Sequence, residues 1–218
     1  MLTQIQSRRF HKFGELILHF SHILADDFNG TIHPDAQLCL DRIRDATLRM
    51  GELIDGLLDL ARVFRSELQV TQVDLSAIAH ELMGMLLDAE RREQTDIRIQ
   101  PGVSASGDPI LLRIALQNLL GNALKFTRQR NPALIEFGTE QQGGRLIYTV
   151  RDNGAGFDMR YAHKLFQPFE RLHDGSAYEG TGIGLATVRR IVVRHRGRVW
   201  AEGEQDAGTR VCFTLNEL

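Results

Sequence analysis

Cysteine is scarce in this chain of 218 residues. The only two, Cys39 and Cys212, are too few and too far apart to indicate a disulfide framework or a cysteine-based metal site. The eight histidines do not cluster with cysteines or carboxylates as metal ligands do. A reduced, cytoplasmic setting is therefore expected.

Long apolar runs and a strong net charge are also missing. No stretch approaches the ~18 apolar residues of a membrane span, and the N-terminus lacks the apolar core of a secretion signal. The formal net charge of −2 argues against a dedicated nucleic-acid binder. With 43% apolar and 25% charged residues, the composition is typical of a soluble globular protein, and neither a membrane span nor a nucleic-acid partner is expected.

Apolar residues recur at alternating steps of three and four in the first 66 residues, which predicts two helices that each carry a heptad seam. The seams comprise Phe10, Phe13, Ile17, Phe20 and Leu24 in the first helix, and Leu40, Ile43, Thr47, Met50, Ile54, Leu57, Ala61 and Phe64 in the second. Asn29-Gly30 and His33-Pro34 break the chain between them, so residues 1–66 are expected to form a helical hairpin.

A two-helix hairpin cannot bury both seams as well as the further apolar residues Leu16, Ile23, Leu53 and Leu60. Pairing with a second copy would form a four-helix bundle, so a homodimer is the favoured interpretation. The alternative is that the hairpin packs on the second domain of its own chain.

Residues 73–218 are expected to form that second domain, after a short polar linker. Apolar patterns predict strands at residues 73–75, 96–100, 134–139, 145–151, 198–202 and 210–215, and helices at residues 76–92, 108–126 and from about 183. Helices that alternate with antiparallel strands favour a two-layer α/β sandwich. The predicted fold class is therefore α+β, with a dimeric helical hairpin followed by the sandwich.

Three polar residues follow one edge of the 108–126 helix. Asn118, Asn122 and Lys125 recur at i, i+4 and i+7, which brings them onto a single stripe opposite the leucines of the same segment. Amide oxygens are suitable ligands for Mg²⁺, and an ammonium group can reach a phosphate. Asn122 is the expected principal magnesium ligand, with Asn118 as a second polar contact and Lys125 as a phosphate contact.

Two glycine-rich segments follow that helix in the sequence, at Asp152-Asn-Gly-Ala-Gly156 and Gly180-Thr-Gly-Ile-Gly-Leu185. Glycines allow backbone N–H groups to approach phosphate oxygens, and Gly182 and Gly184 come directly before an expected helix whose N-terminus can hold phosphate. Such segments can also serve only to turn the chain. Their combination with the polar stripe favours a site for a nucleotide with its magnesium ion.

Four segments together resemble the conserved boxes of sensor histidine kinases. Asn118-Leu-Leu-Gly-Asn-Ala-Leu-Lys-Phe126 resembles their N box, the 152–156 segment their G1 box, Leu165-Phe-Gln-Pro-Phe-Glu-Arg171 their F box and the 180–185 segment their G2 box. The flanking segments 107–113 and 195–200 are similar to those of phytochrome-type kinases. The resemblance covers residues 10–215 and implies a GHKL-type ATP-binding domain.

The resemblance implies ATP and Mg²⁺ as cofactors. It assigns Asp152 to the adenine amino group, with Gly154 and Gly156 giving the base room. The further nucleotide contacts that it implies are Phe169, Arg171, Thr181, Leu185 and Thr209. Phe169 precedes a polar loop at residues 173–179, and this position favours a hinged nucleotide lid over a purely structural role in the core.

The acceptor segment departs from the family pattern. The family places a phosphoryl-accepting histidine early in the first helix, followed by an acid, whereas the seam alignment puts Arg8 and Arg9 at these positions. A guanidinium group has no free lone pair with which to attack phosphorus. His11 lies one turn further on. It is either a displaced acceptor or an ordinary surface histidine.

Two classes of function remain open from the sequence. The first is a kinase core that binds ATP–Mg²⁺ and phosphorylates a histidine on itself or on a partner. The second is a dimeric regulatory module that keeps the nucleotide pocket and acts on a partner kinase or response regulator without transferring phosphate. A serine kinase or ATP-driven clamp on the same fold is a remoter third class, which the dimerising hairpin argues against.

Overall fold

The computed structural model describes residues 67–170 and 182–216, and in the N-terminal part residues 17, 19, 23, 36–44, 46, 47, 50 and 51. The chain divides into two compact units, Met1–Arg62 and Val63–Leu218. In the first unit the described residues are helical, and the Thr47 hydroxyl donates to the Ile43 carbonyl (2.8 Å). Arg8, Arg9, His11 and the predicted hairpin turn lie outside the described residues, so the hairpin and its dimer stay predictions.

The second unit is built on a five-stranded mixed sheet with the strand order β2-β4-β5-β7-β6. Its strands are β2 (Thr95–Ile99), β4 (Ala133–Gln142), β5 (Arg145–Asp152), β6 (Val199–Glu204) and β7 (Gly208–Phe213). Only β2 and β4 are parallel. The strands predicted at residues 134–139 and 145–151 are confirmed and pair as the β4–β5 hairpin. Gly143 and Gly144 both take positive φ angles (58° and 78°) in its turn, which is the geometry that a two-residue hairpin prefers.

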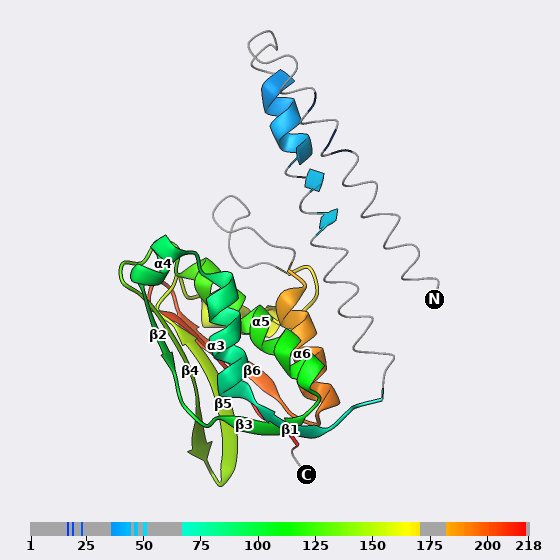
Figure 1. Cartoon of the computed structure of the whole chain (residues 1–218), viewed down its shortest axis with the longest axis vertical. Helices are drawn as coiled ribbons and strands as arrows, with labels where there is room; N and C mark the ends of the chain where they lie inside the picture. The colour runs from blue at the N-terminus through cyan, green and yellow to red at the C-terminus, as the bar shows by residue number, and fades with distance from the viewer. Residues whose placement is uncertain are drawn as a thin grey trace. The chain divides into compact units, whose positions relative to one another are not determined.

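Three helices cover one face of this sheet, as Figure 1 shows. They are α3 (Leu75–Leu86), α5 (Pro109–Phe126) and α6 (Gly184–Arg194), and α5 lies between the other two. The predicted apolar side of α5 is confirmed, because the residues Leu112, Leu116, Leu119, Leu120 and Ala123 are all buried against the sheet or the neighbouring helices. The predicted two-layer α/β sandwich is therefore observed in this unit.

The predicted single helix at residues 76–92 is wrong. The chain leaves α3 at Leu87, which takes an extended conformation and buries its side chain, and it then forms the short helix α4 (Ala89–Glu93). The Asp88 carboxylate caps α4 by accepting a hydrogen bond from the Arg91 N–H (2.8 Å). Burial of Leu87 together with a strong N-cap residue favours two helices over one.

A second, two-stranded sheet was not predicted. It pairs β1 (Thr71–Asp74) with β3 (Ser104–Gly107) in antiparallel register. β3 consists of small residues without apolar alternation, so its sequence carries no strand signal. The two strands lead directly into α3 and α5, and the ribbon thereby determines where these two helices begin.

Candidate nucleotide site

The polar stripe of α5 lies at the boundary between core and solvent. Asn118, Asn122 and Lys125 are each half-buried, whereas their neighbours Leu119 and Leu120 are fully buried. The Asn118 amide donates to the Ile114 carbonyl (2.8 Å), which orients its side chain and leaves Oδ1 directed at the α6 N-terminus. The Lys125 ammonium lies 4.3 Å from the centre of the Phe126 ring. The Asn118 and Lys125 side chains therefore each have a defined contact within the chain.

Asp152 ends the central strand β5 and is only 7% exposed. Its Oδ1 accepts a hydrogen bond from the Gly154 N–H (2.8 Å), and the backbone of Thr209 interacts with the same carboxylate. Burial raises the pKa of Asp152 from 3.8 to about 6, and these two backbone groups oppose that rise. The structure thus places an ionisable carboxylate, held by backbone donors, at the end of the sheet.

The loop after Asp152 packs so closely on its neighbours that two glycines are required. A Cβ atom at Gly154 would come within 2.6 Å of the Phe126 carbonyl oxygen, and one at Gly156 within 1.7 Å of the Glu204 carbonyl oxygen. Gly156 also has a φ of 61°. The Ala155 N–H donates to the Phe126 carbonyl (3.2 Å), which fastens the loop to the end of α5 next to Lys125.

The second glycine segment approaches the same helix from α6. A Cβ atom at Gly184 would lie 2.6 Å from Asn118 Oδ1, so the start of α6 contacts the polar stripe directly. Ile183 occupies the N-cap position without a side-chain hydrogen bond to the first turn of α6. The structure therefore brings together the stripe of α5, the 152–156 loop and the N-terminus of α6.

The predicted lid is described only at its start. Phe166 is buried in the core, whereas Phe169 is 65% exposed with a φ of 65°, and its N–H donates to the Gly182 carbonyl (3.0 Å). Leu185 is half-buried and packs against the core. Arg171, Thr181 and the loop at residues 173–179 lie outside the described residues, so their predicted roles stay predictions.

Amides and phosphates, rather than carboxylates and imidazoles, would have to hold a magnesium ion here. In the part of the chain that the structure describes, no group of three or more His, Cys, Asp or Glu side chains is placed to bind a metal. The half-buried amide of Asn122 fits a hard cation whose remaining ligands come from nucleotide phosphate and water. Asn122 would contribute the oxygen ligand from the protein.

Sequence reasoning missed several residues that shape this site. The Asn153 side chain joins the loop to the start of β4, since its Oδ1 accepts from the Leu134 N–H (2.8 Å) and its amide donates to the Pro132 carbonyl (3.1 Å). Arg130 donates to the Gly154 carbonyl from the turn after α5. Nothing in the sequence distinguishes Arg130 from the other arginines, because its partners come from distant segments.

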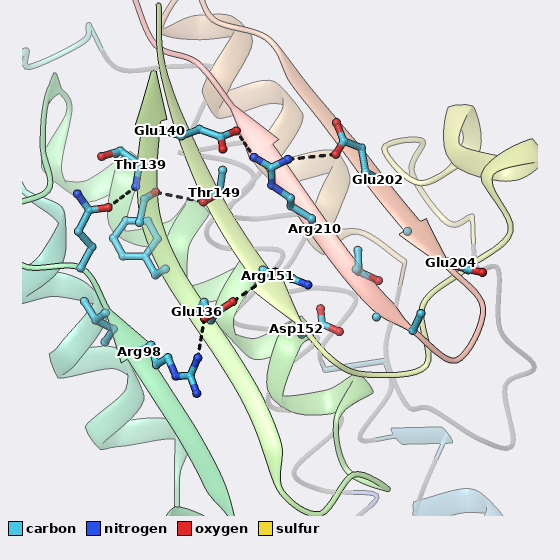
Figure 2. A pocket seen from close by; sticks show the side chains of 18 residues that line it. Arg98, Glu136, Thr139, Glu140, Thr149, Arg151, Asp152, Glu202, Glu204 and Arg210 are labelled. Carbon is cyan, nitrogen blue, oxygen red and sulfur yellow. Dashed lines mark hydrogen bonds and ion pairs between the residues drawn. The ribbon is translucent and has the colours of Figure 1, made fainter. Parts of the chain in front are cut away.

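A hollow of about 860 Å³ lies elsewhere, on the sheet face opposite the helices, and reaches Asp152 only at its edge (Figure 2). Its charged side chains pair with one another across the strands. Arg98 lies 3.3 Å from Glu136, and Arg210 contacts both Glu140 and Glu202. This mutual neutralisation is typical of a solvated sheet face, so the hollow is not the candidate nucleotide site.

A helix layer on a mixed sheet, with two glycine loops and a buried aspartate around an amide-bearing helix, defines an ATP-binding α/β sandwich of the GHKL type. The chain belongs to the family described as "Histidine kinase-, DNA gyrase B-, and HSP90-like ATPase", which matches residues 107–218. The predicted resemblance to sensor histidine kinases is confirmed by the relatives of the whole chain.

Among these relatives, Cyanobacterial phytochrome B of Nostoc sp. is 34% identical over 210 residues, which cover 93% of this chain and 27% of the relative. The methanogenesis regulatory histidine kinase FilI of Methanothrix harundinacea is 33% identical, with 90% and 22% covered. The adaptive-response sensory kinase SasA of Thermosynechococcus vestitus is 35% identical, with 83% and 49% covered. The chain thus spans between a fifth and a half of the length of these relatives.

Solved structures support the fold. Full-length ShkA in complex with AMPPNP has a TM-score of 0.67 at 23% identity, and the match covers 99% of this chain and 45% of ShkA. The catalytic domain of the histidine kinase ThkA has a TM-score of 0.56 at 22% identity, covering 67% of this chain and 95% of that domain. In the described part of this chain, no helix combines the length and apolarity needed to cross a membrane.

Proposed function

We propose that this chain is a histidine-kinase-type core that binds ATP with Mg²⁺ and transfers the γ-phosphoryl group to a histidine in two-component signalling. The observation that carries this proposal is the convergence of three segments on the half-buried polar edge of α5. The amides of Asn118 and Asn122, the loop that starts at Asp152 and the N-terminus of α6 meet there. The family match and the kinase relatives support it.

Each part of the site has a separate role in the proposal. The Asp152 carboxylate accepts a hydrogen bond from the adenine amino group, and Asn122 ligates Mg²⁺. Lys125 contacts phosphate, assisted by backbone N–H groups near Gly182 and Gly184. Positioning and electrostatic stabilisation of the phosphates supply most of the catalysis in phosphoryl transfer, so a protein base is needed only at the accepting histidine.

The dimer belongs to the proposal as well. The described seam residue Ile43 is 46% exposed in the single chain, and Ile17 on the first seam is also exposed. A second copy that pairs through the two seams would cover these side chains. A response regulator or partner kinase is the proposed partner, consistent with the sensory kinases among the relatives.

The acceptor sequence favours a second candidate function. The seam alignment puts Arg8 at the position where the family has its phosphoryl-accepting histidine, and arginine cannot act as the nucleophile. A dimeric regulatory module would bind nucleotide and a partner kinase or response regulator without phosphoryl transfer. The chain would retain kinase activity if a partner supplied the accepting histidine, or if His11 served as a displaced acceptor.

Labelling with γ-labelled ATP separates these candidates. The parent chain is first titrated with ATP and Mg²⁺ by calorimetry, and the absence of binding would refute the nucleotide site itself. Acid-labile label that disappears in His11→Gln assigns the acceptor to His11, whereas label that appears only in Arg8→His shows a degenerate acceptor. If the chain binds ATP but neither its variants nor an added response regulator acquire label, the result would support the regulatory module.

A further inference from the structure

Arg130 joins three segments of the nucleotide site through one guanidinium group. It lies in the turn that follows α5, and its Nη2 donates to the Gly154 carbonyl (3.1 Å) and to the Asp206 carbonyl (2.5 Å). Gly154 belongs to the loop after β5, and Asp206 belongs to the turn between β6 and β7. A single side chain thus holds together the end of α5, the loop after Asp152 and the turn between β6 and β7.

Gly154 stands between Arg130 and the carboxylate of the site. Its carbonyl accepts the hydrogen bond from Arg130, while its N–H donates to Asp152 Oδ1 (2.8 Å). The adjacent residue is fastened on both sides, because the Ala155 N–H donates to the Phe126 carbonyl (3.2 Å) and the Asp206 N–H donates to the Ala155 carbonyl (2.8 Å). Gly154 therefore links the guanidinium of Arg130 to the hydrogen bond that orients Asp152.

We infer that Arg130 is a positioning residue for adenine recognition, which acts by holding Gly154 so that the Gly154 N–H orients the Asp152 carboxylate. This inference rests on the proposed binding of ATP at the site. A contribution through simple charge pairing is small, since the Asp206 carboxylate is 3.7 Å away and largely exposed. The two carbonyl hydrogen bonds carry the effect, because donation from a charged group is stronger than donation between neutral groups.

Base selectivity distinguishes this role from general support of the fold. An ionised carboxylate accepts a hydrogen bond from the amino group of adenine but repels the carbonyl oxygen that guanine carries in its place. A residue that orients the carboxylate therefore affects ATP more than GTP. A residue that only stabilises the domain would change the affinity for both nucleotides by the same factor.

The test compares the Kd values of ATP and GTP, with Mg²⁺, for the parent chain and three variants. Arg130→Gln should weaken ATP binding by about five- to tenfold and GTP binding much less. The ratio of the Kd for GTP to the Kd for ATP should therefore fall. Arg130→Lys should give a ratio between those of the parent and Arg130→Gln, since an ammonium group can still donate to a carbonyl but is more strongly hydrated than a guanidinium group. Arg128→Gln removes an exposed arginine from the same turn and should match the parent.

Two results would overturn the inference: unchanged ATP binding in Arg130→Gln, or equal weakening of ATP and GTP. If Arg130→Gln does not fold, as judged by thermal unfolding, the ratio in Arg130→Lys decides. A ratio below that of the parent supports the positioning role, and a parental ratio refutes it. Failure of the parent to bind ATP would instead refute the proposed function, so the two failures are distinguishable.

Discussion

Burial of the Asp152 carboxylate carries a cost for the folded domain, because its desolvation outweighs the stabilisation of the charge by the backbone groups of Gly154 and Thr209. Burial raises its pKa to about 6 from an ordinary 3.8, so the folded state binds the proton more tightly than the unfolded chain does. Between these two pH values the folded state holds more protons, and the free energy of unfolding therefore falls as the pH rises from about 4 to about 6. Retention of such a group is typical of a functional site.

Asp152→Asn should stabilise the nucleotide-free domain at pH 7 while weakening ATP binding. The amide keeps Oδ1 as an acceptor for the Gly154 N–H and removes a desolvation cost on the order of 2–3 kcal/mol. Thermal unfolding at pH 7 and at pH 5 measures the first effect, and the gain should be smaller at pH 5. A lower melting temperature at pH 7 would contradict this account of Asp152.

The ATP affinity of the parent should also fall as the pH is lowered from 7 to 5, because protonated Asp152 is a weaker acceptor for the adenine amino group. Asp152→Asn serves as the control, since it retains only the pH dependence that comes from protonation of ATP itself. Calorimetric titrations across this range provide the comparison. Identical pH profiles for parent and variant would argue against contact between Asp152 and adenine.

Asn122 should contribute the magnesium-dependent part of the affinity. Asn122→Ala is expected to weaken ATP binding by about tenfold with Mg²⁺ present, and to have little effect when the metal is chelated, since only an oxygen ligand is lost. Gln117→Ala changes an exposed side chain of the same helix and should match the parent. Equal losses with and without the metal would remove Asn122 from the proposed ligands.

At the scale of the element, α5 depends on one residue at its N-terminus. Asp108 Oδ1 accepts from the Ile110 and Leu111 N–H groups (3.0 and 3.1 Å), and its Oδ2 accepts from the Gln69 N–H (3.1 Å). The Asp108 N–H donates to Nε2 of buried His195 at the end of α6 (2.9 Å). Asp108 thus ties the start of α5 to the linker and to α6.

Asp108→Ala should lower the melting temperature by about 5 °C, because it removes the cap of α5 and leaves the Gln69 N–H without its acceptor. Asp108→Asn keeps Oδ1 for the cap but presents an amide to Gln69, so its melting temperature should lie between those of Asp108→Ala and the parent. Thermal unfolding followed by circular dichroism measures both. Equal melting temperatures for the two variants would show that the linker bond, and not the cap, dominates.

On the scale of the whole molecule, the exposed seam residues predict a homodimer through the hairpin. Ile43→Glu and Leu57→Glu place a charge on the seam and should yield monomers or an unfolded hairpin, since each buried side chain of this kind contributes roughly 1.5–3 kcal/mol. Leu38→Glu is the matched control, because Leu38 lies about 200° around the helix from Leu40 and therefore on the face away from the seam. Light scattering that finds a monomeric parent at micromolar concentration would rule out the dimer.

Local patterns were sufficient for most elements of the second unit. The α5 stripe follows from a 3.6-residue period, its cap from Asp108-Pro109, and the β4–β5 hairpin from two glycines between alternating segments. The break at Leu87 was not predicted, since Leu87 continues the apolar pattern and its burial outside the helix depends on tertiary packing. β3 gave no signal because its residues are small, and their partners in β1 lie 30 to 36 positions earlier in the chain.

The candidate site also combines features that the sequence predicts with features that only the folded structure shows. Its glycines, amides and aspartate are recognisable from residue type and spacing, because these chemical features are local. The sequence by itself therefore determined the family, and it predicted the nucleotide and the residues proposed to hold it. The tertiary structure decided what supports them: the burial that raises the pKa of Asp152, the bridge from Arg130 to Gly154, and the contact of Gly184 with Asn118. These depend on chain segments that meet only after folding, and no local pattern encodes the geometry at which they meet.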